Sequence, residues 1–339
     1  LDAVSSVRWS AAYVAGVAEE VKLGDAETFA LAVAELDRIG PRSSAWEMWH
    51  YADDVESGGE LTARYVFVLD TLNFCFWPSP AGIEYEHLAL GLRAALRANP
   101  HAFDPENLVA ATPATVQSWF KDCTTSEDIP LLEERVARVQ ELGHVLQSRY
   151  KGSALEFIRQ ANNSAPELVS LVARELSSFR DETALRGRRL CFYKRAQILV
   201  GDLWAAFGSK TKPTDGDGGS GEGGGVGGGE WFGDMEKLTM FADYRVPQIL
   251  RHLGVLKFSD SLAKAIEDGE VLDAGGRREI EIRAMSILAV ERLREALESS
   301  SKSALGSLNS VQLDWVLWEW GEREKDKLPP FHKTISPFY

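Results

Sequence analysis

The chain has 339 residues, of which 45% are hydrophobic and 10% aromatic, and this composition excludes an intrinsically disordered protein. Its formal net charge of −14 argues against a protein that grips intact duplex DNA or folded RNA, because such binding neutralises phosphates with Lys and Arg. A small phosphorylated ligand stays compatible with this charge, since one or two placed cations hold a single phosphate.

The apolar runs are shorter than the ~20 residues that a membrane span needs, so no membrane partner is expected. Nothing near Leu1 combines a basic stretch with an apolar run, so no secretory signal is expected. Cys75, Cys123 and Cys191 show neither CxxC spacing nor a His at metal-ligand spacing. We interpret them as reduced thiols of a cytosolic or nuclear protein, expect a cytoplasmic location, and predict no zinc site.

Helical periodicity dominates the chain. Asp25 is a predicted N-cap, residues 29–39 keep helical spacing, and Gly40 ends the run, so that a hairpin of two helices is expected in the first sixty residues. Residues 63–77 are densely apolar without a clear period, and either a buried helix followed by a loop or short strands would fit them. Further helices are predicted at residues 130–146, at 167–176, from about 192, from about 247 to 254, and at 259–269, 277–297 and 308–320.

Residues 214–230 consist almost entirely of Gly, Asp, Ser and Glu, a composition typical of a flexible loop. Because helical patterns resume on both sides, we interpret this stretch as an insertion into a single helical domain that spans residues 1–339.

Asp243 stands between Phe241 and Tyr244, with Arg245 beside it and a predicted helix start just beyond. A helix N-terminus and a guanidinium favour an ionised carboxylate, and aromatic walls exclude water. Such an acid can act as a nucleophile or stabilise an oxocarbenium ion. The simpler interpretation, an Asp that caps a helix, is the more frequent one on chemistry alone.

Two further segments carry candidate ligand contacts. Lys194 and Gln197 share one helix face with Tyr193 adjacent, which suits a phosphate or ligand cradle or, more simply, a solvated face. The aromatic run at residues 72–77 could wall a pocket for a flat base, with Asn73 supplying an amide, or could be core packing. The sequence has no GxGxxG that opens a helix after a strand, and it lacks Walker, HExxH and GxSxG motifs.

Three segments together resemble signatures of the queuosine salvage protein family, the queuosine 5'-phosphate N-glycosylases/hydrolases. They are residues 72–78 (LNFCFWP), 192–198 (FYKRAQI) and 240–248 (MFADYRVPQ). The likeness runs nearly end to end, through residues 7–8 (VR), 163–165 (NSA), 179–181 (FRD), 279–284 (EIEIRA) and 330–332 (PFH). The Gly-rich insertion is longer than the family pattern predicts.

The resemblance implies an all-α fold akin to helix-hairpin-helix DNA glycosylases. It also implies an N-glycosidic hydrolase that releases queuine from the small-molecule substrate queuosine 5'-monophosphate, without a metal or organic cofactor. An essential Asp and an essential Lys of the family match Asp243 and Lys194. Asp243 would attack the anomeric carbon or stabilise its positive charge, and Lys194 would bind the 5'-phosphate.

The remaining substrate contacts are assigned by chemistry. Arg245 or Arg283 would join Lys194 on the phosphate, aromatic rings would stack on the base, and Asp202 would meet the secondary ammonium of queuine. The predicted substrate-binding set is Asn73, Phe74, Phe76, Trp77, Tyr193, Gln197, Asp202, Tyr244, Arg245 and Arg283. Two alternatives stay open: a glycosylase that acts on a base within DNA or tRNA, and a non-catalytic helical scaffold.

Overall fold

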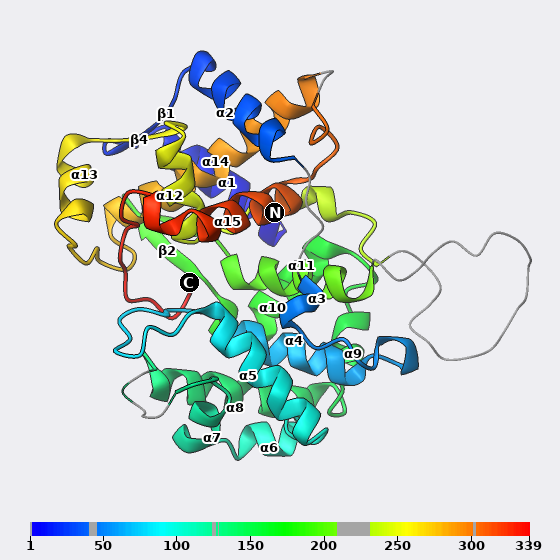
Figure 1. Ribbon diagram of the computed structural model, residues 1–339. Helices are drawn as coiled ribbons and strands as arrows, with labels where there is room; N and C mark the ends of the chain where they lie inside the picture. Colours follow the sequence, from blue (N-terminus) through cyan, green and yellow to red (C-terminus); the bar gives the residue numbers. More distant parts are fainter. Residues whose placement is uncertain (1, 41–45, 124–126, 128, 209–230, 301–302) are drawn as a thin grey trace, which may run out of the picture. The chain divides into compact units, whose positions relative to one another are not determined.

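The computed structural model describes residues 2–40, 46–123, 127, 129–208, 231–300 and 303–339. These residues fold mainly into helices, with two small two-stranded sheets (Figure 1). The predicted mainly helical fold class is therefore confirmed, whereas the likeness to helix-hairpin-helix DNA glycosylases stays a prediction. No described helix is long and apolar enough to cross a lipid bilayer.

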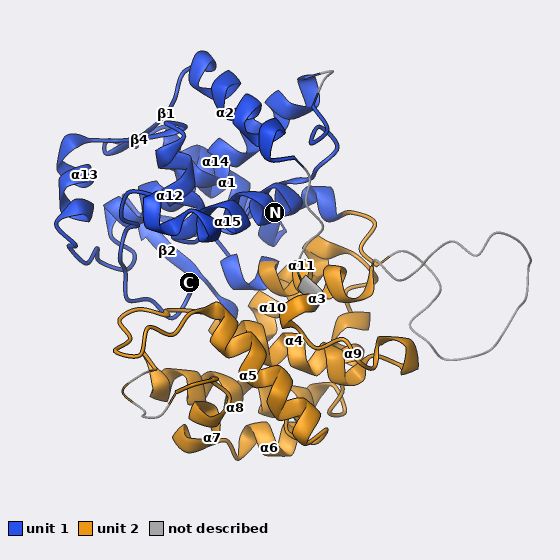
Figure 2. Ribbon diagram, in the orientation of Figure 1, with its two compact units in different colours: residues 1–44, 179–197, 235–339 blue, residues 45–178, 198–234 orange. Residues whose placement is uncertain are grey.

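The chain divides into two compact units, shown in different colours in Figure 2. Unit 1 comprises residues 1–44, 179–197 and 235–339, and unit 2 comprises residues 45–178 and 198–234. The prediction of one domain over residues 1–339 stays a prediction. The Gly-rich insertion predicted at residues 214–230 lies outside the described residues.

Unit 1 is built around the long helix α14. This helix packs against α1, α2, α12 and α15, and most of its apolar side chains are buried. The helices are α1 (Ala3–Ala15), α2 (Ala26–Ile39), the first turn of α11 (Lys194–Phe207), α12 (Arg245–His252), α13 (Asp260–Glu267), α14 (Arg277–Ser299) and α15 (Ser310–Arg323). The short 3-10 turns are Met235–Lys237 and Lys325–Lys327.

The caps of unit 1 follow the sequence closely. The Oδ1 atom of Asp25 accepts a hydrogen bond from the Thr28 N–H at 3.0 Å, and Gly40 ends α2 with a φ of 73°, as predicted. Ser259 likewise caps α13. Helix α15 packs closely on α12 at Gly321. A Cβ atom added to Gly321 would lie 2.9 Å from the side chain of Arg245, so the absence of a side chain there permits the contact.

The N-terminal helical hairpin is a wrong prediction. Between α1 and α2 runs strand β1 (Val21–Leu23), which pairs antiparallel with β4 (Leu256–Phe258), and both helices pack on α14. The second sheet is the hairpin of β2 (Glu182–Leu185) and β3 (Arg188–Cys191). Strands of three or four residues are too short for a period of two to be read from sequence.

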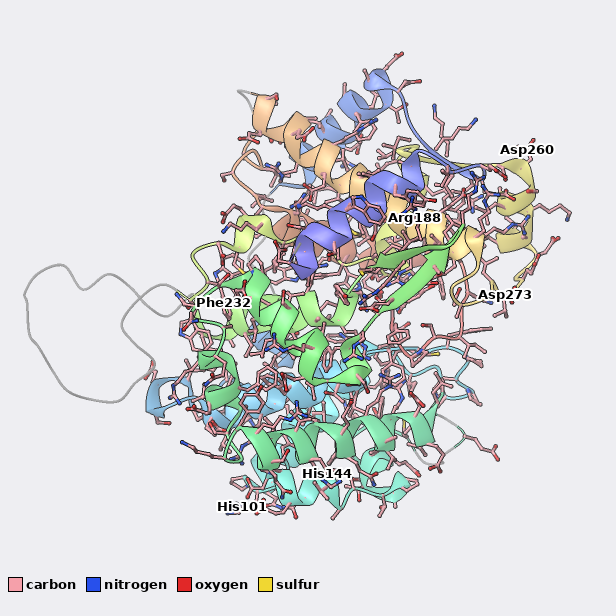
Figure 3. The ribbon with its side chains drawn as sticks, turned by 180° about the vertical axis from the view of Figure 1, so that it is seen from behind. His101, His144, Arg188, Phe232, Asp260 and Asp273 are labelled. Carbon is pink, nitrogen blue, oxygen red and sulfur yellow. The ribbon has the colours of Figure 1, made fainter. Side chains whose placement is uncertain are left out.

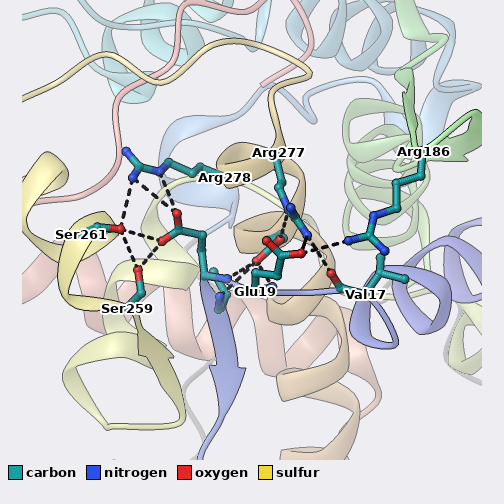
Figure 4. A network of polar contacts seen from close by, with 10 residues as sticks. Val17, Glu19, Arg186, Ser259, Ser261, Arg277 and Arg278 are labelled. Carbon is teal, nitrogen blue, oxygen red and sulfur yellow. Dashed lines mark hydrogen bonds and ion pairs between the residues drawn. The ribbon is translucent and has the colours of Figure 1, made fainter.

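The buried carboxylate of Glu281 connects α14 to the start of β1. The side chain of Glu281 is fully buried, and its Oε2 accepts hydrogen bonds from the backbone N–H groups of Glu19, Glu20 and Val21 at 2.7–3.1 Å. Its Oε1 accepts from Arg277 at 2.8 Å. Figure 4 shows how this network extends to the neighbouring polar side chains Arg186, Ser259, Ser261 and Arg278.

Unit 2 is helical throughout its described part. Its core helix α8 packs against α4, α6 and α7, and Gly143 permits the contact with α6 because an added Cβ would lie 2.7 Å from the Pro105 carbonyl oxygen. The helices are α3 (Trp46–Trp49), α4 (Glu60–Leu72), α5 (Tyr85–Ala98), α6 (Pro105–Val109), α7 (Pro113–Ser118), α8 (Leu132–Arg149), α9 (Ala154–Arg159), α10 (Ala165–Glu175) and the remainder of α11. Its described residues also form the short 3-10 turns Val55–Ser57 and Ser177–Phe179, and the latter ends at the first residue of the second segment of unit 1.

The run at residues 63–77 is a buried helix, α4, followed by a loop, which is the first of the two predicted alternatives.

His101 and His144 are exposed on unit 2 (Figure 3). Within the described ranges, no group of three or more His, Cys, Asp or Glu side chains is arranged to hold a metal ion.

Candidate active site

Asp243 lies in the loop that leads into α12. Its backbone N–H donates to the Phe241 carbonyl at 2.7 Å, and its Oδ1 accepts from the Val246 N–H at 2.9 Å. The side chain is buried, with 7% of its surface exposed. The loop thus fixes the carboxylate at a helix start.

A second buried acid, Asp314 of α15, belongs to the same cluster. Its Oδ1 accepts from the Phe241 N–H at 2.9 Å. Burial raises the pKa of Asp314 well above its usual value and the negative charge of Asp243 raises it further, while the Phe241 N–H and the Lys194 charge oppose the shift. Burial also raises the pKa of Asp243, against the lowering effects of Lys194, Val246 and Arg245. The pair therefore favours a state with one carboxylate and one carboxylic acid.

Lys194 is the first residue of α11 and is buried. Its backbone N–H donates to Oδ2 of Asp181 at 3.2 Å, and Tyr193 before it has a φ of 47°. The Tyr193 hydroxyl donates to Glu182 at 2.6 Å, and burial is the main cause of its raised pKa. The ammonium of Lys194 acts electrostatically on both Asp243 and Asp314, so it belongs to the same charged cluster.

Gln197, on the same helix α11 as Lys194, binds the chain four residues before Asp243. Its Oε1 accepts from the backbone N–H and the hydroxyl of Thr239 at 3.0 and 3.1 Å, and its Nε2 donates to the Phe192 carbonyl at 3.3 Å. Both ends of this amide therefore bind the protein itself, which favours a bridging role over the predicted ligand contact.

Tyr244 and Arg245 follow Asp243 at the start of α12, where Arg245 is buried and Tyr244 is half-buried. The Arg245 guanidinium binds Glu322 and Gln248, each at 2.6 Å, and lies 5.5 Å from the Tyr244 ring centroid. The Tyr244 ring in turn packs against Phe331, with centroids 4.7 Å apart. Their predicted roles in substrate binding stay predictions.

Arg283, predicted as a second phosphate contact, is buried within the protein's own polar groups. Its Nη1 and Nη2 donate to the two carboxylate oxygens of Asp181 at 3.0 and 2.5 Å, and its Nε donates to the Ala242 carbonyl at 3.1 Å. A further bond of 3.3 Å reaches Glu279. This geometry favours a structural link over a phosphate contact.

The predicted base-stacking segment lies in unit 2. Arg135 is completely buried and donates to the carbonyl oxygens of Leu72, Phe74 and Cys75, which shapes the loop after α4. Its guanidinium lies 4.3 Å from the Phe74 ring centroid, so Phe74 is part of the core. The loop residues Phe76 and Trp77 are only half-buried and stay the better stacking candidates.

Acidic side chains are also buried in unit 2. Asp202 of α11 and Asp70 of α4 both lie in its interior, and Asn73 donates to Asp70 at 3.3 Å. Burial raises the pKa of the Tyr85 phenol well above its usual value, and the charges of Asp202 and Asp70 add to that shift.

The predicted site residues fall into two sets, one in each unit. Unit 1 contains Tyr193, Lys194, Gln197, Asp243, Tyr244, Arg245 and Arg283, and unit 2 contains Asn73, Phe74, Phe76, Trp77 and Asp202.

Comparison with known proteins decides the family. A family model described as queuosine salvage protein matches residues 50–339. The chain is 39% identical, over the whole of both chains, to a queuosine 5'-phosphate N-glycosylase/hydrolase of Dictyostelium discoideum. The chain belongs to the queuosine salvage protein family. Relatives with the same name are 38% identical in Sphaerobacter thermophilus, over 91% of each chain, and 36% identical in Mus musculus, over 98% of each chain.

Family membership confirms the resemblance found in the sequence. Two acids, Asp314 and Asp181, which accept hydrogen bonds from the Phe241 and Lys194 N–H groups, escaped prediction as site residues. Asp314 lies between Leu313 and Trp315 in a predicted helix, and an acid in this apolar setting was the available signal. Asp181 ends the segment at residues 179–181, which the resemblance included without a role. Its importance comes from the fold, because it faces Arg283 from 102 positions away in the sequence.

Proposed function

We propose that this chain is an N-glycosidic hydrolase that releases queuine from queuosine 5'-monophosphate and thereby supplies the base for tRNA modification. The observation that carries the proposal is the end-to-end likeness to relatives named queuosine 5'-phosphate N-glycosylase/hydrolase. The buried cluster of Asp243, Lys194 and Asp314 supports it with a carboxylate suited to glycosidic chemistry.

Asp243 is the proposed catalytic residue. A 7-deazapurine has no ring N7 to protonate, so the leaving base lacks the easiest activation route and stabilisation of the ribosyl cation carries more of the catalysis. The burial of Asp243 strengthens the field of its carboxylate, and the Val246 N–H fixes its orientation before the substrate arrives. A covalent ribosyl intermediate and direct attack by water both require this ionised carboxylate.

Lys194 has two proposed effects. Its ammonium lowers the pKa of Asp243 and so favours the ionised form that the reaction needs. As the first residue of α11, it also combines a side-chain cation with a helix N-terminus, a pairing suited to the 5'-phosphate. Phosphate binding would supply binding energy remote from the bond that breaks.

The test compares three substrates at equal concentration: queuosine 5'-monophosphate, the unphosphorylated nucleoside, and intact queuosine-containing tRNA. The proposal predicts fastest release of free queuine from the mononucleotide. Faster release from tRNA would support the polymer-directed glycosylase instead, and no release from any of the three would support the non-catalytic scaffold.

A further inference from the structure

We infer that Arg283, paired with Asp181, is a positioning residue that holds two short segments in one arrangement. They are residues 192–194, the Lys194 segment, and residues 241–243, the Asp243 segment. The inference rests on the proposed function, in which these two segments supply the catalytic groups. It assigns Arg283 to the support of the site and not to the phosphate of the substrate.

The first link runs from Arg283 to the Asp243 segment. The Nε of Arg283 donates to the carbonyl oxygen of Ala242 at 3.1 Å, and this carbonyl belongs to the residue directly before Asp243. One residue earlier in the same short segment, the Phe241 N–H donates to Asp314 at 2.9 Å. Two buried side chains from α14 and α15 therefore hold the peptide groups that precede the carboxylate.

The second link runs through Asp181 to the Lys194 segment. Arg283 grips both oxygens of Asp181, and Oδ2 of Asp181 also accepts from the backbone N–H of Lys194 at 3.2 Å. The backbone carbonyl of Asp181 accepts from the Phe192 N–H at 3.0 Å. Asp181 thus fixes the turn from which Lys194 starts α11.

Two aromatic rings, those of Phe192 and Tyr339, pack against the guanidinium of Arg283. The central carbon of the Arg283 guanidinium lies 4.1 Å from the centroid of Phe192 and 4.3 Å from that of Tyr339. The side chain is 3% exposed, and the carboxylate of Glu279 balances its charge together with Asp181. An arginine is suited to this place because its planar fork serves two acceptors at once and stacks on rings, whereas a lysine ammonium does not.

Gln197 makes a second connection between these parts of the chain, because it binds both Thr239 and Phe192. Arg283 differs from Gln197 in that its contacts lie immediately beside Asp243 and, through Asp181, on Lys194 itself. Misplacement of a catalytic group by about 1 Å can cost on the order of 100-fold in rate, so a loosened Arg283 should appear in turnover.

The test uses the full chain with Arg283→Lys and a matched control, Arg278→Lys. Arg278 lies five residues earlier in α14, and its guanidinium is 3.4 Å from the carboxylate of Glu20 in a partly exposed pair. The melting temperature and the helical circular dichroism signal establish that each variant is folded. For Arg283→Lys we expect kcat for queuosine 5'-monophosphate to fall by roughly 10- to 100-fold with KM changed by less than about threefold. The control should keep both constants.

Asp181→Asn provides a second variant, because the amide keeps the shape of the side chain and loses the charge that orients Arg283. It should lower kcat in the same direction, and combining it with Arg283→Lys should cost little more than the larger single effect, since both act on one link. A folded Arg283→Lys or Asp181→Asn protein with the parent's kcat would overturn the inference. An equal loss in kcat for Arg278→Lys would do the same.

A readout that does not depend on turnover separates this inference from the proposed function. Carbon-13 NMR of labelled aspartate follows the titration of the Asp243 carboxyl, assigned with Asp243→Asn. Since the nearby Lys194 charge lowers the pKa of Asp243, Arg283→Lys should shift that titration to higher pH, and Arg278→Lys should leave it in place. If the parent releases no queuine, the proposed function fails, and an unshifted Asp243 titration in Arg283→Lys then overturns the positioning role independently.

Discussion

The Oδ1 atom of Asp243 accepts the backbone N–H of Val246 at 2.9 Å, so the proposed catalytic carboxylate is also a helix cap. The two interpretations of this residue are therefore compatible. One oxygen satisfies a helix N-terminus that would otherwise lack an acceptor, and this bond fixes the direction of the other oxygen. The same contact favours the ionised form by lowering the pKa of Asp243, although burial acts more strongly in the opposite direction.

Lys194→Ala should discriminate between the nucleotide and the nucleoside. If Lys194 binds the 5'-phosphate, its loss should reduce kcat/KM for queuosine 5'-monophosphate by about 100-fold, the equivalent of roughly 3 kcal/mol for a charge-assisted bond. The effect on the unphosphorylated nucleoside should be clearly smaller. Steady-state kinetics on both substrates measure the difference, and an equal loss on both would refute the phosphate role.

The pH dependence of kcat/KM should report the ionisation of Asp243. Burial raises its pKa, so activity in the parent should increase with pH through a value above the ordinary 3.8 of an aspartate. Lys194 lowers this pKa, so the residual activity of Lys194→Ala should have its acidic limb at higher pH than the parent. A limb that stays in place or moves to lower pH would contradict the electrostatic link.

Asp314→Asn should flatten the pH dependence of folding stability. The raised pKa of Asp314 means that the folded state favours its protonated form, so this group's stabilisation is complete below 3.8 and is lost as pH rises through the raised pKa. An amide is uncharged at every pH, and its oxygen can still accept the Phe241 N–H. Urea unfolding at several pH values should therefore show equal or greater stability for Asp314→Asn at pH 7. A marked loss at that pH would show that Asp314 is held ionised.

Glu281 should be among the most important side chains for the stability of unit 1. Glu281→Ala leaves three backbone N–H groups without their buried acceptor and should lower the free energy of unfolding by about 3–5 kcal/mol. Glu281→Gln keeps one acceptor oxygen and should cost about 1–3 kcal/mol. Chemical denaturation measures both.

The partly exposed Arg278 is the control for Glu281, and Arg278→Lys should change the free energy of unfolding by less than about 1 kcal/mol. Equal effects at the two positions would refute the importance given to the buried carboxylate.

Local signals in the sequence predicted the long elements well. Asp25 and Gly40 mark the two ends of α2, and the helices around residues 132–149, 277–299 and 310–323 all follow their apolar period. The start of a helix after Asp243 was also correct. These features depend on residues within one or two turns of each other, which is the range that periodicity and capping describe.

Features that depend on distant residues escaped prediction. Strand β1 exists because it pairs with β4, with Val21 opposite Phe258, and because Glu281 accepts the backbone N–H groups of residues 19–21. The sequence suggested Arg245 or Arg283 as a second phosphate contact, and the contacts that Arg283 makes within the protein could not be read from it. Its acceptors, Asp181 and Ala242, become neighbours only through the fold.

Whether Asp243 is the catalytic carboxylate is decided by incubating the parent chain and the Asp243→Asn variant with queuosine 5'-monophosphate and quantifying free queuine by mass spectrometry. We expect release by the parent and a rate at least ~100-fold lower for Asp243→Asn, with an unchanged melting temperature and retained binding of the nucleotide. Release of queuine by a folded Asp243→Asn protein at the parent's rate would refute the catalytic role of Asp243.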